Sequence, residues 1–222
     1  MQVAEALGPD LLASTAFVGG VTTGLLLTDE LALQSVRATD DVDLIIDALG
    51  YSKNAEFEET LRSLGFVDRM DGEVIGRKWL GEVQVDFMST DKSFGFTNRW
   101  YKEALESAEN YSLTSDLTIR LLTPEYFVAT KLEAYNGRGN GDMLGSRDLE
   151  DIMSLINGRD TIVEDIKSSS TTLLQYIIDQ LKLLSGDQDF EYLIQSTVAG
   201  DSERADYVYE VIDKIIGETC GE

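Results

Sequence analysis

The hydrophobic positions of the first half of the chain recur in short runs, and those of the second half recur at helical spacing. In 83–88, Val83, Val85 and Phe87 alternate with Gln84, Asp86 and Met88. This two-residue period is typical of a strand with one buried face. Other short apolar runs predict further strands at 16–18, 42–46, 74–80 and 117–122. The Gly81-Glu82 pair predicts a two-residue hairpin between the strand at 74–80 and the strand at 83–88.

Helical spacing marks most of the remaining chain. Phe57, Leu61 and Leu64 share one face of a segment that ends at Gly65. Thr123 and Ser146 are suited to cap two later helices, at 124–135 and 147–156. Further helices are expected at 2–7, 10–14, 21–27, 98–108 and throughout the chain after 161, and a loop is expected at 136–142. The pattern predicts an α+β protein, with a mixed twisted sheet flanked by helices in 1–122 and a mostly helical C-terminal part, 123–222, packed on that core.

Composition narrows the function classes. The chain has 222 residues, of which 43% are apolar, so it can bury a sizeable core. It lacks histidine, which excludes histidine-based zinc sites and Ser-His or Cys-His catalysis. The single cysteine, Cys220, fits a reducing compartment, and no long apolar run is present. We therefore expect a cytoplasmic protein with no membrane partner.

The net charge is strongly negative. The chain carries 41 acidic and 18 basic residues, a formal charge of −23. Such a charge repels nucleic acid at long range and disfavours an extended surface for duplex DNA. A small nucleotide, or an RNA end held at a local basic patch, stays open as a ligand.

Three aspartates are candidate metal-binding residues. Asp41 and Asp43 lie two apart at the start of an apolar run, so a strand would present both carboxylates on one face. Such residues most often mark turns or solvated strand ends. If the strand that carries Asp86 lies beside them, however, three carboxylates converge, enough to hold two magnesium or manganese ions about 3.5–4 Å apart. The pair Gly19-Gly20, between a short strand and a helix start, is suited to phosphate.

The order of a glycine pair, two aspartates separated by one residue and a later strand aspartate resembles the nucleotidyltransferase core of the DNA polymerase β superfamily. From about 17 to 159, the chain is more narrowly similar to the AbiEii-type nucleotidyltransferases of toxin–antitoxin and phage-defence systems. That similarity is carried by the segments 37–44 (RATDDVDL), 95–101 (GFTNRWY), 124–134 (PEYFVATKLEA) and 146–152 (SRDLEDI).

The resemblance implies roles for individual residues. Asp41, Asp43 and Asp86 would form the catalytic metal site with Mg2+ or Mn2+, Asp86 also orienting or deprotonating an attacking hydroxyl. The triphosphate would lie against Gly19, Gly20 and Thr22. Val21 stands where many members carry serine or threonine, so Thr22 or Thr23 would have to supply the hydroxyl that contacts the phosphates. The segment 28–39 is longer than usual.

The resemblance adds two residues of the C-terminal part to the expected nucleotide site. Lys131 corresponds to a lysine that serves the nucleotide's phosphates, although a lysine on a helix is usually a solvated residue. Asp148 matches a further acidic position of the nucleotide site, although an acidic residue in a first helical turn is ordinarily a partner of the helix dipole.

The expected reaction is transfer of NMP from an NTP to an acceptor hydroxyl, on an RNA end or a protein. The resemblance implies a toxin-like component of a toxin–antitoxin or defence system, with a cognate antitoxin as a further partner. Two alternatives stay open. The chain could bind nucleotide without turnover, or it could dock a basic antitoxin through its acidic surface.

Overall fold

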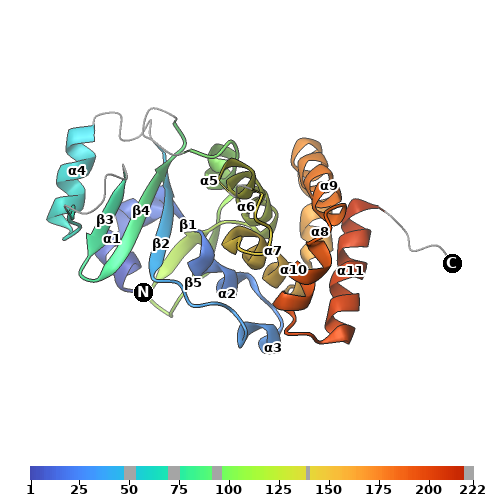
Figure 1. Cartoon of the computed structure of the whole chain (residues 1–222). Helices are drawn as coiled ribbons and strands as arrows, with labels where there is room; N and C mark the ends of the chain where they lie inside the picture. Colours follow the sequence, from blue (N-terminus) through green and yellow to red (C-terminus); the bar gives the residue numbers. More distant parts are fainter. Residues whose placement is uncertain (48–53, 70–75, 92–96, 139–140, 218–222) are drawn as a thin grey trace. The chain divides into compact units, whose positions relative to one another are not determined.

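The computed structural model describes residues 1–47, 54–69, 76–91, 97–138 and 141–217 (Figure 1). These residues form two compact units. The first unit contains Met1–Thr22 and Ala38–Thr123, and the second contains Thr23–Arg37 and Pro124–Glu222. The first unit therefore ends one residue beyond the boundary expected at 122, but Thr23–Arg37 belongs to the second unit.

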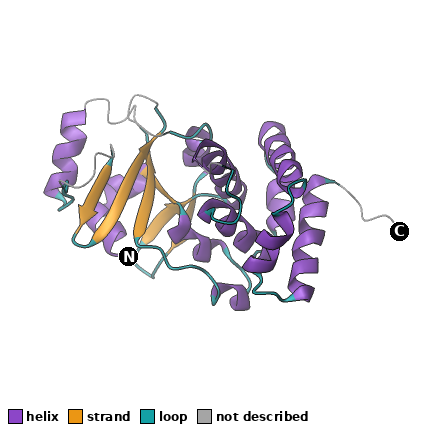
Figure 2. Cartoon of the chain, viewed as in Figure 1, coloured by secondary structure: helices purple, strands orange, loops and turns teal. Residues whose placement is uncertain are grey.

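The first unit is built on one mixed sheet, which confirms the α+β class. In the described residues this sheet has six strands in the order β3-β4-β2-β1-β6-β5. Figure 2 shows the strands in orange. The pairs β2·β4 and β1·β6 are parallel, and the other neighbouring pairs are antiparallel. The strands are β1 Thr15–Val18, β2 Asp41–Ile46, β3 Arg77–Leu80, β4 Val83–Ser89, β5 Glu109–Ser112 and β6 Thr118–Leu121.

The helices of the first unit are short. The segment α1, Gln2–Ser14, is kinked at Gly8, whose φ of 69° interrupts the helical backbone before Pro9. The two helices expected there are thus the two arms of α1. The others are the 3-10 turn η1 Gly20–Thr22, α4 Asn54–Ser63 and α5 Tyr101–Ser107. Phe57 of α4 and Phe66 each meet the Phe87 ring of β4 edge to face, with ring centroids 5.7 and 5.6 Å apart.

The second unit is helical. Its described elements are α2 Thr23–Leu26, α3 Glu30–Leu33, α6 Pro124–Arg138, α7 Arg147–Gly158, α8 Ile162–Lys167, α9 Thr171–Ser185, α10 Phe190–Thr197 and α11 Ser202–Ile216. Ser146 caps α7 as expected, since its side chain accepts a hydrogen bond from the Leu149 N–H at 3.3 Å. Among the described residues, no helix combines the length and the hydropathy that a membrane span requires.

The segment Thr23–Arg37 is attached to the end of α7. The N–H groups of Thr28 and Asp29 both donate to the carbonyl of Gly158, at 2.9 and 3.0 Å. A Cβ on Gly158 would lie 2.6 Å from the Ala32 Cβ and 3.0 Å from Leu27 Cδ2. Only a residue without a side chain fits here, so glycine allows this close packing.

Several local expectations hold and others do not. The hairpin at Gly81-Glu82 is present, with Leu80 paired to Val83. The expected helix at 21–27 is divided into η1 and α2, and the expected loop from 136 was wrong at its start because α6 continues to Arg138. Strand β5 was not expected. The first residues of the strand expected at 74–80 lie outside the described residues.

We predict that Gly158→Ala lowers the free energy of unfolding by about 1–3 kcal/mol, because the added methyl group overpacks the contact with Ala32 and Leu27. The matched control is Gly137→Ala in α6, where an added Cβ meets nothing within 4 Å. That variant should be neutral or up to about 1 kcal/mol more stable, because alanine favours a helix. Urea unfolding followed by circular dichroism measures both, and equal midpoints would contradict the packing.

Candidate functional site

Three charged side chains form a row across strands β2, β4 and β3, which we call the carboxylate row: Asp43, Asp86 and Arg77. Asp43 is paired with Asp86 in the parallel register of β2 and β4, and Asp86 is paired with Arg77 in the antiparallel register of β4 and β3. Paired residues of neighbouring strands project from the same face of a sheet. Asp41 projects from that face as well, because it lies two residues before Asp43. The strands that carry these aspartates, β2 and β4, are therefore neighbours, as expected.

Arg77 holds Asp86 through both carboxylate oxygens. Its Nε donates to Oδ1 and its Nη2 to Oδ2, each at 2.8 Å. The Gln84 amide is best oriented with its oxygen toward the guanidinium, 3.1 Å from Nη2 and 3.2 Å from Nε. The hydrogen bonds that the guanidinium donates to Asp86 are the main cause that raises the pKa of Arg77. Burial opposes this rise, and the charges of Asp86, Asp41 and Asp43 add to it. The negative charge of the whole face thus acts on this guanidinium.

The face suits a divalent cation in its donor chemistry, although the side chains do not form a closed cage. Carboxylate oxygens are the ligands that magnesium and manganese prefer. In the part of the chain that the structure describes, no three acidic or sulfur side chains lie close enough to enclose one metal ion. Asp86 is engaged by Arg77. The three carboxylates and one guanidinium of this face leave two formal negative charges for a cation to neutralise.

The glycine turn lies directly against the carboxylate row. Val18 is paired with Asp43, and Gly19 follows it with φ of 78°. A Cβ on Gly19 would overlap the Asp43 carboxylate, so only glycine allows this approach. The backbone of Gly19, and of Gly20 where η1 begins, is therefore held beside Asp43.

Thr22 closes that turn from inside. Its N–H and its hydroxyl both donate to the Gly19 carbonyl, at 3.1 and 2.8 Å. Its side chain is fully buried. The expected contact of the Thr22 hydroxyl with a phosphate thus does not match the described position, where the hydroxyl stabilises the turn.

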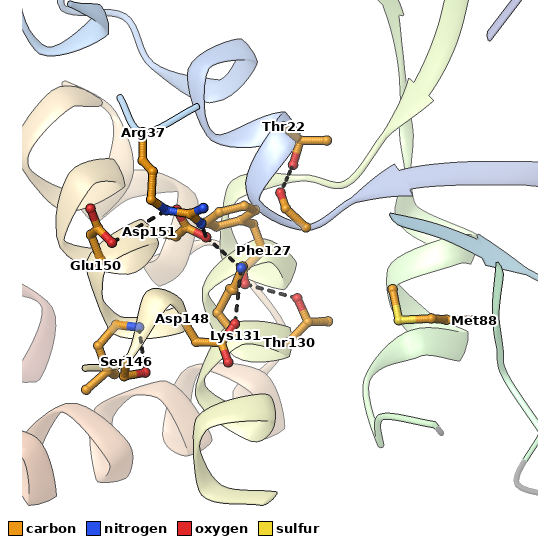
Figure 3. A network of polar contacts seen from close by, with 12 residues as sticks. Thr22, Arg37, Met88, Phe127, Thr130, Lys131, Ser146, Asp148, Glu150 and Asp151 are labelled. Carbon is orange, nitrogen blue, oxygen red and sulfur yellow. Dashed lines mark hydrogen bonds and ion pairs between the residues drawn. The ribbon is translucent and has the colours of Figure 1, made fainter. Parts of the chain in front are cut away.

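Lys131 and Asp148 meet inside the second unit (Figure 3). The Lys131 ammonium on α6 donates to Asp148 at 3.1 Å and to Asp151 at 2.6 Å, both on α7. Lys131 is only 8% exposed. Burial alone would lower the pKa of Lys131, but the charges of Asp151 and Asp148 outweigh burial and raise it. The ammonium therefore joins α6 to α7 and faces two carboxylates instead of solvent.

Arg37 extends this cluster. Its guanidinium lies 3.5 Å from Asp151 and 3.5 Å from Glu150, and its buried Nε has no hydrogen-bond partner (Figure 3). Two cations thus face three carboxylates. A phosphate could reach Lys131 only if the carboxylates exchanged partners, so the expected phosphate role requires a rearrangement of this cluster.

The predicted residues fall into two groups. Asp41, Asp43, Asp86, Gly19, Gly20 and Thr22 belong to the first unit, and Lys131 and Asp148 belong to the second. Arg77 and Asp151 were not singled out from the sequence. Asp151 lies three residues after Asp148, so helical spacing alone places it on the same face. Gly95 and Phe96, which contribute to the resemblance, lie outside the described residues.

We predict that Gly19→Ala destabilises the protein more than Gly8→Ala. Both glycines have a positive φ, a backbone conformation that costs alanine about 1–3 kcal/mol. An added Cβ at Gly8 meets nothing within 4 Å, whereas at Gly19 it overlaps Asp43. The overlap should add about 1–3 kcal/mol. Urea midpoints of the two variants measure the difference, and equal losses would show that Gly19 is not confined by Asp43.

We predict that Lys131→Met costs about 3–5 kcal/mol, because it removes the buried ammonium that Asp148 and Asp151 share. The Arg37 guanidinium, 3.5 Å from Asp151, remains as a counter-charge for that carboxylate. The exposed residue Lys182 of α9 supplies the control, and Lys182→Met should change stability by less than about 0.5 kcal/mol.

The contribution of Lys131 to stability should also depend on pH, because folding raises the pKa of Lys131. This contribution to the free energy of unfolding is complete below about pH 10.4 and is lost as the pH rises through the pKa of the folded state. Unfolding measured from pH 7 to 11 tests this; a gap between wild type and Lys131→Met that narrows below pH 10 would contradict it.

Comparison with protein-family models finds no match to this chain, and comparison with curated proteins finds no significant relative.

Proposed function

We propose that the chain is a metal-dependent nucleotidyltransferase that moves NMP from an NTP to an acceptor hydroxyl on an RNA end or a protein. One observation carries the proposal: the register of β2 and β4 sets Asp43 beside Asp86, with Asp41 on the same face. The close approach of Gly19 to Asp43 adds a glycine turn at the same place. The resemblance to polymerase-β-like enzymes of the AbiEii type supports the same function.

Asp41 and Asp43 are the residues that would hold the cation, because their carboxylates share one face of β2. When bound, Mg2+ or Mn2+ supplies positive charge to the phosphates and to the oxygens that enter and leave. The half-buried backbone at Gly20, where η1 begins, is suited to contact the triphosphate, whereas Gly19 is buried against Asp43. Thr22 fixes the shape of that turn. Lys131 and Asp148 enter the nucleotide site by resemblance alone.

Asp86 orients the acceptor hydroxyl and takes its proton in this mechanism. The hydroxyl oxygen forms a bond to the α-phosphorus, while the bond from the α-phosphorus to the bridging oxygen breaks and pyrophosphate leaves. The proton moves from the acceptor hydroxyl to Asp86. Asp86 can act as this base only when Arg77 no longer occupies both of its oxygens.

The resemblance further supports a toxin-like role beside a cognate antitoxin. A second candidate is nucleotide binding without turnover. The specific observation in its favour is the ion pair of Asp86 with Arg77, since the guanidinium occupies both carboxylate oxygens that would have to receive the proton. Release of pyrophosphate in the presence of an acceptor separates the two functions.

We predict that wild-type protein incubated with each labelled NTP, magnesium and total cellular RNA or protein labels one class of macromolecule. Asp41→Asn and Asp43→Asn should each lower this transfer at least about 100-fold, because they remove charge directed at the reacting groups. Asp40→Asn is the matched control, since Asp40 is exposed and precedes β2, and it should leave transfer within about twofold of wild type. Transfer that persists in the Asp41→Asn variant with a normal urea midpoint would remove the assignment.

A further inference from the structure

The ion pair of Arg77 with Asp86 joins the candidate site to the edge of the sheet. We propose that Arg77 competes with a divalent cation for Asp86, so that the site takes up a metal–nucleotide complex more readily than a free metal ion. This inference rests on the proposed function and concerns the ligand that the same site accepts.

The geometry of the ion pair makes the two occupants of Asp86 mutually exclusive. Both oxygens of Asp86 accept from the guanidinium at 2.8 Å. A paired fork of this kind uses one lone pair on each oxygen, and a cation held by both oxygens of the carboxylate would need the same two. A divalent cation at Asp86 would also lie beside a guanidinium of like charge, so its binding there requires Arg77 to leave.

Arg77 is placed so that its side chain can leave without moving its strand. Among the described strands, β3 lies at the edge of the sheet, where Val67 bridges it at Trp79, and the Arg77 side chain is 30% exposed. The backbone beside it is fixed, because the N–H of Phe87 donates to the Gly76 carbonyl at 2.9 Å and a Cβ at Gly76 would overlap the Phe87 carbonyl. An arginine on a fixed strand can move its head group by rotamer change alone.

The displaced guanidinium would need a new anionic partner. A free metal ion supplies none, whereas a metal bound to a triphosphate brings phosphate oxygens, which a guanidinium binds through the same paired geometry. The metal–nucleotide complex therefore replaces both halves of the ion pair at once: the metal takes Asp86, and a phosphate takes Arg77. In the absence of ligand, Arg77 offsets the repulsion among Asp41, Asp43 and Asp86.

The test measures binding of Mn2+ to the full chain by electron paramagnetic resonance, alone and with a non-hydrolysable NTP analogue. In wild type, the analogue should tighten Mn2+ binding at least about tenfold. Arg77→Gln should tighten binding of free Mn2+ about tenfold, because the like charge is gone, and should lose most of the enhancement by the analogue. Arg77→Lys should lie between them, because lysine keeps the charge without the paired geometry. Arg62→Gln, on the exposed surface of α4, removes the same charge elsewhere and should behave as wild type.

The outcomes separate this inference from the proposed function. If free Mn2+ binds wild type, Arg77→Gln and Arg77→Lys equally, while Asp41→Asn abolishes binding, the role of Arg77 is overturned and the metal site stands. If neither wild type nor Arg77→Gln binds Mn2+ with or without the analogue, both the inference and the proposed function are overturned. Urea unfolding of each variant shows which ones are folded. If Arg77→Gln does not fold, the comparison of wild type with Arg77→Lys still decides the test.

Discussion

The parallel pairing of β2 with β4 is the constraint on which the candidate site depends. It aligns Asp41–Ile46 with Gln84–Ser89, and its buried apolar residues, such as Leu44 and Phe87, fix which residue stands beside which. Side chains alternate along a strand, so a slip of one residue would turn Asp86 to the other face and expose its apolar neighbours. The burial of the core and the position of the carboxylates are thus set by one register.

Positive charge is scarce in this chain, and its placement is therefore informative. With 18 basic against 41 acidic residues, most carboxylates must rely on solvent. Several cations are nevertheless committed to acidic clusters: Arg77 in the carboxylate row, Lys131 and Arg37 beside α7, and the buried Lys78 between Glu58 and Asp68. Each cluster keeps more carboxylates than cations. Both groups of predicted residues are therefore negative overall, which favours a ligand that arrives with its own cations.

The sequence could predict elements whose signals are local. The two-residue hairpin and the Ser146 cap follow from side-chain chemistry within a few residues. The same hairpin implies the partner of Asp86, since counting back from Gly81-Glu82 pairs it with Arg77. Strand β5 was missed because its exposed, polar Glu109 and Asn110 show no apolar alternation, and only pairing with β6 makes it a strand. The burial of Thr22 and the two partners of Lys131 depend on contacts distant in sequence, which no local pattern encodes.

The assignment of Thr23–Arg37 to the second unit has a consequence for how the chain can be divided. This segment is an insertion between β1 and β2, and its Leu27 and Ala32 are buried at the end of α7. A fragment that stopped at Thr123 would carry these apolar residues without their cover, and a fragment that began at Pro124 would leave Gly158 without its neighbours. No single cut yields two fragments that each keep their own buried contacts, so the two units have to be expressed and folded as one chain.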